Sequence, residues 1–349
     1  MFRKLFRQLS KDVGIDMGTS NTLVYVKDKG LIINEPSIVA LNNRTEQILA
    51  VGEEARRMIG KAPAYISVTR PIVAGIISDF EVTEKMIKHF IDRVHRESSS
   101  LLPRPRVIIG IPLDVTEVER KAVEDATLGA GASEVYLVEQ TMAAAIGARM
   151  PIQEPVGNMI VQMGGGTTEV AVISLGGIVT FTSLKHGGLK LDQNIIQYVR
   201  ENFNLLLGER TAEDIKKNLG NVYLEGTVKE QKVRGRDLYT GLPREVDVSS
   251  AQVKEAIIAD IRDLIEHIRD TLEKTPPELV AEIYQKGIIL SGGGALLSGL
   301  DKLIAKELKI PVKVTDDPIT SVVRGTGLIM EDFNNLKDIL LPTAGDMIN

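Results

Sequence analysis

The chain has 349 residues, which is too long for one ordinary hydrophobic core and suits two lobes. Its formal net charge of −5 argues against a nucleic-acid-binding protein, which would usually be basic overall. The chain has no cysteine and its four histidines show no ligand spacing, so disulfide bonds and thiolate or histidine metal sites are not expected.

The first ten residues form an amphipathic pattern. Arg3, Lys4 and Arg7 lie on one side of a helix drawn through them, with no acidic residue between them. The opposite face carries the large apolar side chains of Phe2, Leu5, Phe6 and Leu9. We expect an interfacial membrane anchor that holds weakly as a single copy and well in an array of copies. The alternative is a helix docked on its own domain.

A strand, a tight glycine turn and a second strand are predicted over residues 13–26. The turn reads Gly18-Thr19-Ser20-Asn21 and closely follows Asp16. Glycine has no β-carbon to keep a phosphate away from backbone N–H groups, and the neighbouring hydroxyls offer further hydrogen bonds. Residues 31–41 then alternate like a pair of strands, and a short helix is expected from residue 53 to 59.

The next part of the chain has the element order of an α/β domain. Helices are predicted over residues 83–96 and 116–129, and strands over 106–112 and 134–140. A helix of small residues follows over 142–148 and is suited to close packing between lobes. In the loop after the first of these helices, Leu101 and Leu102 are either a second membrane contact or part of a loop tucked inward.

A second glycine turn repeats the design of the first at a constant offset of 146 residues. Asp16 falls on Gln162, Gly18 on Gly164 and Thr22 on Thr168, and apolar residues alternate after both turns. Repetition at this scale indicates two related lobes, each offering one phosphate-binding hairpin to a shared cleft. The alternative is two unrelated glycine turns.

The rest of the chain adds helices and a third glycine turn. Helices are predicted over residues 192–203 and from a Thr211 cap onward, then a β-rich insertion over 222–250 and a long helix over 250–274. Glu213 and Lys216 are three residues apart and share a helical face, as a surface ion pair would. The third turn, Gly292-Gly293-Gly294-Ala295, follows a strand and precedes a helix starting near Leu296, whose first N–H groups suit a nucleotide.

Several motifs carry a family resemblance across nearly the whole chain. They include Asp16-Met17-Gly18-Thr19-Ser20-Asn21-Thr22, Asn34-Glu35-Pro36-Ser37, Ala143-Ala144-Ala145-Ile146-Gly147-Ala148, Gly164-Gly165-Gly166-Thr167-Thr168-Glu169, Gly208-Glu209-Arg210-Thr211-Ala212-Glu213 and Gly292-Gly293-Gly294-Ala295-Leu296-Leu297. In this order and spacing they resemble the actin, sugar-kinase and heat-shock-chaperone ATPase superfamily, and within it the MreB family of bacterial actins, which are rod shape-determining proteins.

The resemblance implies an α/β, actin-like ATPase fold with two lobes, each built on a mixed β-sheet flanked by helices. Lobe I would comprise residues 1–142 plus about 318–349, with a small insertion at about 33–75. Lobe II would comprise residues 143–317, with a small insertion at about 185–245.

The resemblance also implies that ATP or ADP and Mg²⁺ bind between the lobes. The phosphates would be held by Gly18, Thr19, Ser20 and Asn21 from one side, and by Gly164, Gly165, Gly166, Thr167 and Thr168 from the other. Asp16 would hold a water of the Mg²⁺ shell, since magnesium keeps most of its waters. The ribose would meet Glu213 and Lys216, and the adenosine would meet Gly292, Gly293, Gly294 and Ala295.

Three residues depart from the family pattern near this site. Gln140 stands where the family usually has the glutamate that activates water, and Gln162 stands where it usually has aspartate. Leu189 follows two glycines where an acidic residue is usual. An amide cannot accept a proton at neutral pH, so hydrolysis by Asp16, Gln140, Gln162 and Thr168 would be slow or absent while nucleotide binding remains. Glu139 would not replace Gln140, because neighbours on a strand point to opposite faces.

By resemblance, the function is a membrane-associated, ATP-binding protein that polymerises into filaments and organises cell-wall synthesis and rod cell shape. It would be cytoplasmic and peripheral on the inner face of the cell membrane, with itself and membrane proteins of the elongation machinery as partners, and no nucleic acid. One alternative is a hydrolysis-deficient, nucleotide-bound scaffold filament. A remote alternative is a small-molecule kinase of the same superfamily, for which no substrate lobe is evident.

Overall fold

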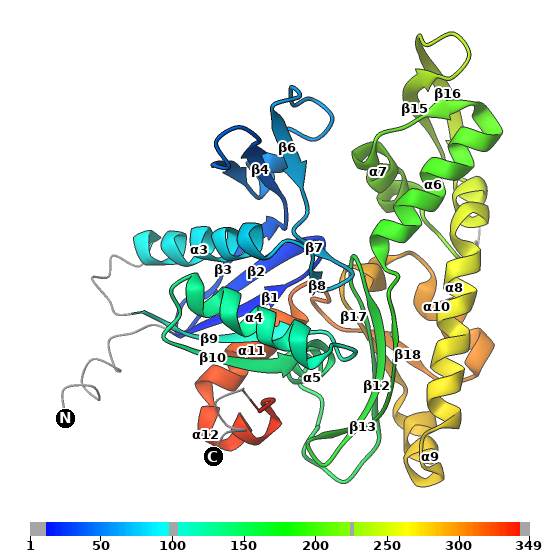
Figure 1. Ribbon diagram of the computed structural model, residues 1–349. Helices are drawn as coiled ribbons and strands as arrows, with labels where there is room; N and C mark the ends of the chain where they lie inside the picture. Colours follow the sequence, from blue (N-terminus) through cyan, green and yellow to red (C-terminus); the bar gives the residue numbers. More distant parts are fainter. Residues whose placement is uncertain (1–11, 98–103, 224–226, 343–349) are drawn as a thin grey trace. The chain divides into compact units, whose positions relative to one another are not determined.

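The computed structural model of the protein describes residues 12–97, 104–223 and 227–342. They form two compact units (Figure 1). The first unit contains the described residues up to Pro155, Ser174–Ile178 and the described residues from Ile319 onward. The second unit contains Val156–Ile173 and the described residues of Val179–Pro318.

The first unit is built on a mixed five-stranded sheet in the order β10-β9-β1-β2-β3. Its strands are β1 (Val13–Met17), β2 (Asn21–Val26), β3 (Gly30–Pro36), β9 (Arg106–Ile111) and β10 (Glu134–Glu139). Strand β1 runs antiparallel to β2 and parallel to β9. The side chains of β1 alternate between faces, so Val13, Ile15 and Met17 enter a core with the apolar residues of α3 (Phe80–Glu97) and α4 (Glu117–Gly129).

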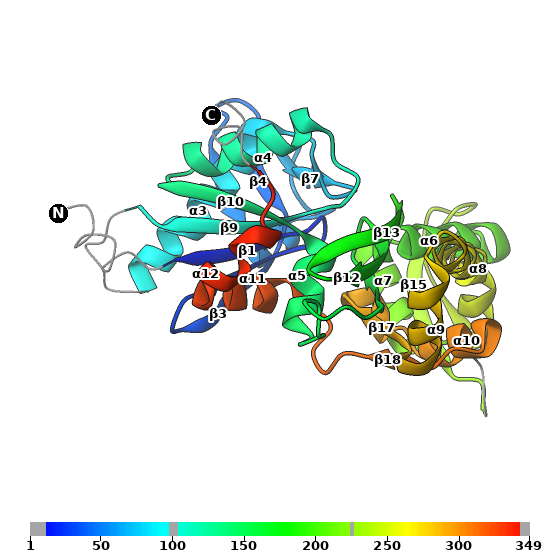
Figure 2. The same cartoon turned by 90° about the horizontal axis from the view of Figure 1, so that it is seen from below.

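The opposite face of this sheet is covered by α11 (Ser321–Glu331), as Figure 2 shows. A β-carbon at Gly14 of β1 would lie 2.2 Å from Oγ1 of Thr326. Helix α5 (Gln140–Gly147) packs on α11 just as closely, because a β-carbon at Gly147 would lie 1.9 Å from the carbonyl oxygen of Ser321. The small-residue helix therefore belongs to the first unit and packs on α11 there, although the sequence analysis placed it at the start of lobe II.

A small insertion follows β3 in the first unit. It contains a three-stranded sheet of β4 (Val39–Asn42), β5 (Ile48–Val51) and β6 (Ile66–Thr69), the short helix α2 (Glu53–Arg56), and the hairpin of β7 (Ile72–Val73) and β8 (Ile76–Ile77). The carboxylate of Glu35 accepts hydrogen bonds from the backbone N–H of Glu53 and from Nη1 of Arg93, both at 2.9 Å. This carboxylate thereby joins the insertion to α3.

The second unit repeats the sheet of the first. Its order is β13-β12-β11-β17-β18, with β11 (Asn158–Met163), β12 (Thr168–Ser174), β13 (Gly177–Leu184), β17 (Ile288–Ser291) and β18 (Val312–Val314). Met17 pairs with Thr22 across the first hairpin, and Met163 pairs with Thr168 across the second. The offset of 146 residues therefore holds in the strand register. The alternative that the two glycine turns are unrelated is wrong.

Helices pack on one face of this second sheet and share a hydrophobic core with it. They are α6 (Gly188–Phe203), α7 (Glu209–Leu219), α8 (Ser250–Glu273), α9 (Pro277–Lys286) and α10 (Leu300–Leu308). Helix α7 begins after Gly208, so the predicted Thr211 cap is wrong. The third glycine turn leads into a 3₁₀ turn over Gly293–Leu296, and the α-helix expected near Leu296 begins only at Leu300. Helix α9 was not predicted.

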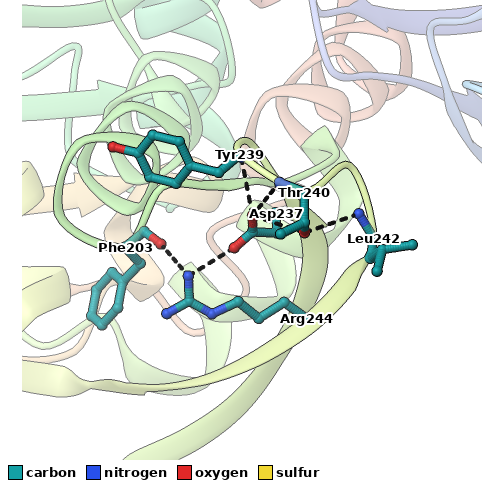
Figure 3. Close-up of polar contacts among 6 residues, drawn as sticks. All are labelled: Phe203, Asp237, Tyr239, Thr240, Leu242 and Arg244. Atoms are coloured by element: carbon teal, nitrogen blue, oxygen red, sulfur yellow. Dashed lines mark hydrogen bonds and ion pairs between the residues drawn. The ribbon is translucent and has the colours of Figure 1, made fainter.

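A two-stranded extension of the second unit ends in a turn that several hydrogen bonds hold. Strands β15 (Glu230–Asp237) and β16 (Pro243–Ser249) join β14 (Leu205–Leu206) in a small sheet. In the turn, the Asp237 carboxylate accepts hydrogen bonds from the backbone N–H groups of Thr240 and Tyr239 and from Nη1 of Arg244 (Figure 3). The Thr240 N–H and Arg244 lower the pKa of Asp237 to about 2. The carboxylate thus fixes the turn while the Tyr239 side chain stays exposed.

The described chain ends beside the first sheet. Helix α12 (Phe333–Leu336) follows α11, and the Phe333 ring packs edge-on against Tyr136 of β10 with 5.0 Å between ring centroids. The backbone N–H of Leu341 donates to the carbonyl of Leu137, which pairs the end of the described chain with the β10 edge.

Candidate functional site

The first glycine hairpin connects β1 to β2 and is held by Ser37, at the end of β3. The Ser37 hydroxyl donates to the carbonyl of Gly18 at 2.6 Å, and the Ser37 N–H donates to the carbonyl of Ser20 at 2.9 Å. In a trans peptide the C=O and the following N–H point in opposite directions. Fixing the Gly18 carbonyl on Ser37 therefore turns the N–H of Thr19 away from Ser37.

The polar side chains of this hairpin are used to fix its shape. Thr22 donates its hydroxyl hydrogen to Oγ of Ser37 at 2.9 Å, since the single hydrogen of Ser37 goes to Gly18. Oγ1 of Thr19 accepts from the N–H of Gly75 at 2.8 Å, and Nδ2 of Asn21 donates to Asn34. The side chains of Thr19 and Asn21, both predicted to bind phosphate, are thus bonded to Gly75 and Asn34. The backbone is therefore the part of this hairpin that is suited to a phosphate.

Asp16 and Gln140 lie together beside the first hairpin. Nε2 of Gln140 donates to Oδ1 of Asp16 at 3.2 Å, and both side chains are buried. Burial raises the pKa of Asp16 to about 7, against the smaller lowering effect of the Gln140 hydrogen bond. A nearby cation would hold this carboxylate in its charged form.

Gln140 occupies the first position of α5, and Glu139 is the residue before the helix. The strand that was predicted to include Gln140 ends at Glu139, so the strand-based argument against Glu139 is wrong. Burial raises the pKa of Glu139, and Arg120 only partly offsets this effect.

The residues around Asp16 fit a magnesium ion that keeps most of its water. One carboxylate and the side-chain oxygen of Gln140 supply oxygen atoms, and Mg²⁺ usually takes only one or two carboxylates from the protein. Among residues 12–97, 104–223 and 227–342, no group of three or more acidic or histidine side chains forms an all-protein metal cage. The chemistry of the site therefore suits a hydrated ion accompanied by phosphate oxygens.

The second glycine hairpin connects β11 to β12 and is held by the first turn of α6. The N–H of Gly188 donates to the carbonyl of Gly164, and the N–H of Leu189 donates to the carbonyl of Gly165, both at 2.9 Å. Oγ1 of Thr168 donates to the carbonyl of His186 at 2.8 Å. Thr168, predicted as catalytic, thus commits its hydroxyl hydrogen to the backbone.

Gln162 occupies in the second hairpin the place that Asp16 has in the first. Asp16 pairs with Leu23 across the first hairpin, and Gln162 pairs with Glu169 across the second. The Gln162 side chain is buried, and its Oε1 has no hydrogen-bond partner among the described residues. A buried acceptor of this kind is costly unless a donor reaches it, which suits a site completed by a ligand or its water.

Glu213 and Lys216 lie on α7 but do not pair with each other. Oε1 of Glu213 lies 2.6 Å from Nζ of Lys217. Nζ of Lys216 lies 2.8 Å from Oδ1 of Asp192 and donates to the carbonyl of Gly188 at 2.6 Å. Asp192 and His186 were not predicted as site residues, because nothing in the sequence around them indicates which distant group they contact.

The third glycine turn packs on the end of β11, next to the second hairpin. Gly292 has φ +82°, and a β-carbon there would lie 2.3 Å from the carbonyl oxygen of Met163. A β-carbon at Gly294 would lie 2.2 Å from Cγ of Met163, whereas Gly293 borders open space. The second unit therefore brings Gly292–Ala295 close to the glycine hairpin, as a nucleotide-binding role for both would require.

The predicted membrane-contact residues lie outside the described residues. These are Phe2, Leu5, Phe6, Leu9, Leu101 and Leu102. Among the described helices, none combines the length and the apolar character that a membrane span needs.

Two repeated sheets, each with a glycine hairpin in the same register, are typical of the actin-like fold. The sequence model described as MreB/Mbl protein matches residues 10–338. The chain belongs to the MreB/Mbl family.

Individual relatives match this family member over almost their whole length. The cell shape-determining protein Mbl of Bacillus subtilis is 47% identical over 327 residues, which cover 94% of this chain and 98% of the relative. The cell shape-determining protein MreB of Escherichia coli is 46% identical over 335 residues, covering 95% of this chain and 96% of the relative.

A solved structure shows the same fold. The crystal structure of MreB5 of Spiroplasma citri bound to ADP superposes with a TM-score of 0.89 at 34% identity, covering 94% of this chain and 98% of that one. MreB5 has also been solved with AMPPNP. The expected α/β, actin-like fold is therefore confirmed.

Proposed function

We propose that this MreB/Mbl family member binds ATP, polymerises into filaments and organises cell-wall synthesis and rod cell shape. It acts from the cytoplasm as a peripheral protein on the inner face of the cell membrane. Its partners are further copies of itself and the membrane proteins of the elongation machinery.

The observation that carries the nucleotide part of this proposal is the matched pair of glycine hairpins. Each has its carbonyls fixed by neighbouring groups, through Ser37 in the first unit and through Gly188 and Leu189 in the second. This arrangement leaves backbone N–H groups for phosphate. MreB5, which shares the fold, is known with ADP and with AMPPNP. Asp16, beside the first hairpin, suits the water shell of the accompanying Mg²⁺.

The filament and membrane parts rest on different support. The relatives Mbl and MreB are named cell shape-determining proteins, and the family resemblance implies assembly. The amphipathic first ten residues favour attachment to an anionic membrane, where basic residues add roughly 1 kcal/mol each. Polymerisation places many such weak anchors on one surface, so the array binds far more tightly than a monomer.

Sedimentation with vesicles tests this proposal directly. At micromolar protein with ATP, Mg²⁺ and vesicles containing anionic lipid, we expect the protein to sediment with the vesicles as filaments visible by electron microscopy. A variant lacking the apolar anchor residues Phe2, Leu5, Phe6 and Leu9 is the matched control and should form filaments without binding vesicles. Monomeric protein in the supernatant under all these conditions would contradict the proposal.

A second candidate function is a scaffold filament that holds nucleotide without turnover. Gln140 donates an amide hydrogen to Asp16, and Gln162 carries an amide in place of a carboxylate. Neither side chain can therefore act as a general base. A positioned general base contributes roughly 10²–10⁴-fold to rate. Loss of the base slows hydrolysis without removing the hairpins that hold phosphate.

Phosphate release separates the two candidates. The natural chain is compared with the double variant Gln140→Glu, Gln162→Asp at saturating ATP and Mg²⁺, after ATP binding has been confirmed for both. We expect the double variant to release phosphate roughly 10²-fold faster, because it regains a proton acceptor. If the natural chain already turns over at the same rate, Gln140 suffices and the scaffold candidate is wrong.

A further inference from the structure

A buried ion pair joins α6 to α7 close to the second glycine hairpin. The proposed function gives this pair no role. Nζ of Lys216, on α7, lies 2.8 Å from Oδ1 of Asp192, on α6. The side chains are 15% and 7% exposed. Burial raises the pKa of Asp192, and Lys216 only partly offsets that effect. A pair with this desolvation cost is weak evidence for stability, so its geometry is the better guide to its role.

Lys216 holds the start of α6 as well as Asp192. The same Nζ donates to the carbonyl of Gly188 at 2.6 Å. Gly188 is the first residue of α6, and Asp192 lies one helical turn later, so both contacts of Lys216 fix this one turn. Lys216 therefore sets the position of the α6 N-terminus relative to α7.

The α6 N-terminus in turn fixes the glycine hairpin. The N–H groups of Gly188 and Leu189 donate to the carbonyls of Gly164 and Gly165. At Gly187 there is no space for a side chain, because a β-carbon would lie 2.5 Å from the Gly164 carbonyl oxygen. The first free N–H groups of a helix commonly bind a ligand anion. Here two of them bind the hairpin instead.

Fixing these two carbonyls determines where the next N–H groups point. Across a trans peptide, the N–H of Gly165 points opposite to the carbonyl of Gly164, and the N–H of Gly166 points opposite to the carbonyl of Gly165. Both N–H groups are therefore turned away from α6. Neither donates to a backbone carbonyl within the described part of the chain.

We propose that Lys216 and Asp192 are a positioning pair for the second glycine hairpin. They hold Gly188 so that α6 fixes the hairpin carbonyls and the N–H groups of Gly165 and Gly166 are directed at the phosphates of a bound nucleotide. The inference rests on the proposed nucleotide binding, and it assigns Lys216 an action through Gly188 rather than through the ribose.

Hydrogen exchange without nucleotide tests the positioning step by itself. The variants are Lys216→Met, Asp192→Asn and their combination, with Lys216→Arg as the conservative change. Lys232→Met is the matched control, because it removes a lysine from an exposed pair with Glu245 in the same unit.

In this experiment we expect amide exchange to rise at least about tenfold in segments 163–168 and 187–191 of the Met and Asn variants. The long helix α8 should keep its protection. The double variant should be no worse than either single variant, since the two residues act as one pair. A uniform rise across the second unit would mean general stabilisation and would overturn the proposal.

Ligand affinity then tests the consequence for phosphate. ADP and adenosine are titrated calorimetrically into the natural chain and each variant. We expect Lys216→Met to weaken ADP about tenfold and adenosine less than about twofold, with Lys216→Arg restoring most of the ADP affinity. Equal weakening of ADP and adenosine would make Lys216 a nucleoside ligand and would overturn the proposal. If the natural chain binds no ADP, the proposed function fails, and the exchange result alone decides whether the pair positions the hairpin.

Discussion

The two glycine hairpins have the same strand register, but different kinds of group bind the carbonyl of the first glycine in each. In the first unit, one buried serine side chain, Ser37, meets the Gly18 carbonyl and the Thr22 hydroxyl. In the second unit, the backbone N–H groups of Gly188 and Leu189 meet the hairpin carbonyls. The contacting segment follows β3 in the first unit and β13 in the second. A repeated sheet therefore preserves the place of the contact while its chemistry changes.

The hairpins also differ in the residue beside the turn. The first has Asp16, whose charge is costly in its buried position, and the second has Gln162, which is neutral at any pH. The backbone geometry of the hairpin is thus repeated in the second unit, whereas the carboxylate beside it is not. If this comparison holds, matched mutations at the two hairpins should differ in their effects on stability.

The largest effect is expected from closing the space at Gly187. Gly187→Ala places a β-carbon 2.5 Å from the Gly164 carbonyl oxygen, where backbone atoms cannot easily move. We expect a loss of about 2–4 kcal/mol in the free energy of unfolding, measured by urea denaturation. The control is Gly208→Ala, because no atom lies within 4 Å of that added β-carbon. Equal stability of the two variants would show that α6 does not press on the hairpin.

The next effect concerns Asp16 and depends on pH. Its pKa is near 3.8 in the unfolded chain and about 7 in the folded protein. At a pH between these two pKa values, Asp16 has lost its proton in the unfolded chain but keeps it in the folded protein. The free energy of unfolding therefore falls as pH rises from about 4 to 7. In nucleotide-free protein we therefore expect Asp16→Asn to be about 2 kcal/mol more stable at pH 8 and to lose this advantage by pH 4.

The matched change in the second hairpin is Gln162→Asp. It introduces a carboxylate at the equivalent strand position, so it should add a decline in stability with rising pH that the natural chain lacks at this site. Urea unfolding at a series of pH values measures both variants. Parallel pH curves for the natural chain and Asp16→Asn would contradict the burial argument.

The smallest effect is expected from removing the side-chain hydroxyl that forms hydrogen bonds at each hairpin. Ser37→Ala leaves the Gly18 carbonyl and the Thr22 hydroxyl without their partner in a buried place, and we expect a loss of about 1–2 kcal/mol in stability. Thr168→Val removes one donor from the carbonyl of His186, which is an exposed residue, so water replaces it and the cost should be below about 1 kcal/mol. The reverse order would mean that the second hairpin depends more on side chains than the first.

The position of both hairpins could be predicted from the sequence, because glycine turns between apolar alternating stretches have a local signature. The partners of those hairpins could not. Ser37 was part of a recognised motif, but its contact with Gly18 depends on where β3 ends beside β1 and β2. In the sequence, Asp192 does not differ from other acidic residues on helices. Its contact with Lys216 exists only because α7 packs beside α6.

The ends of helices and strands were predicted less well where tertiary packing determines them. Gln140 continues a strand-like stretch in the sequence but begins α5 in the structure. The helix that follows was expected to pack between lobes, and it packs on α11 because Gly147 and Gly325 let the two backbones approach. Helix α9 starts at Pro277, shortly after the end of the predicted long helix, where no further helix was predicted.

Local sequence patterns are enough to predict the α/β class, the repeated strand–turn–strand unit and its offset of 146 residues, because side-chain periodicity and glycine placement act within a few residues. The groups that fix each hairpin, the unit that holds α5, and the contacts of Lys216 with Asp192 and Gly188 depend instead on how the elements pack. Those contacts join segments far apart in the chain, and their geometry exists only after the sheets and helices have packed.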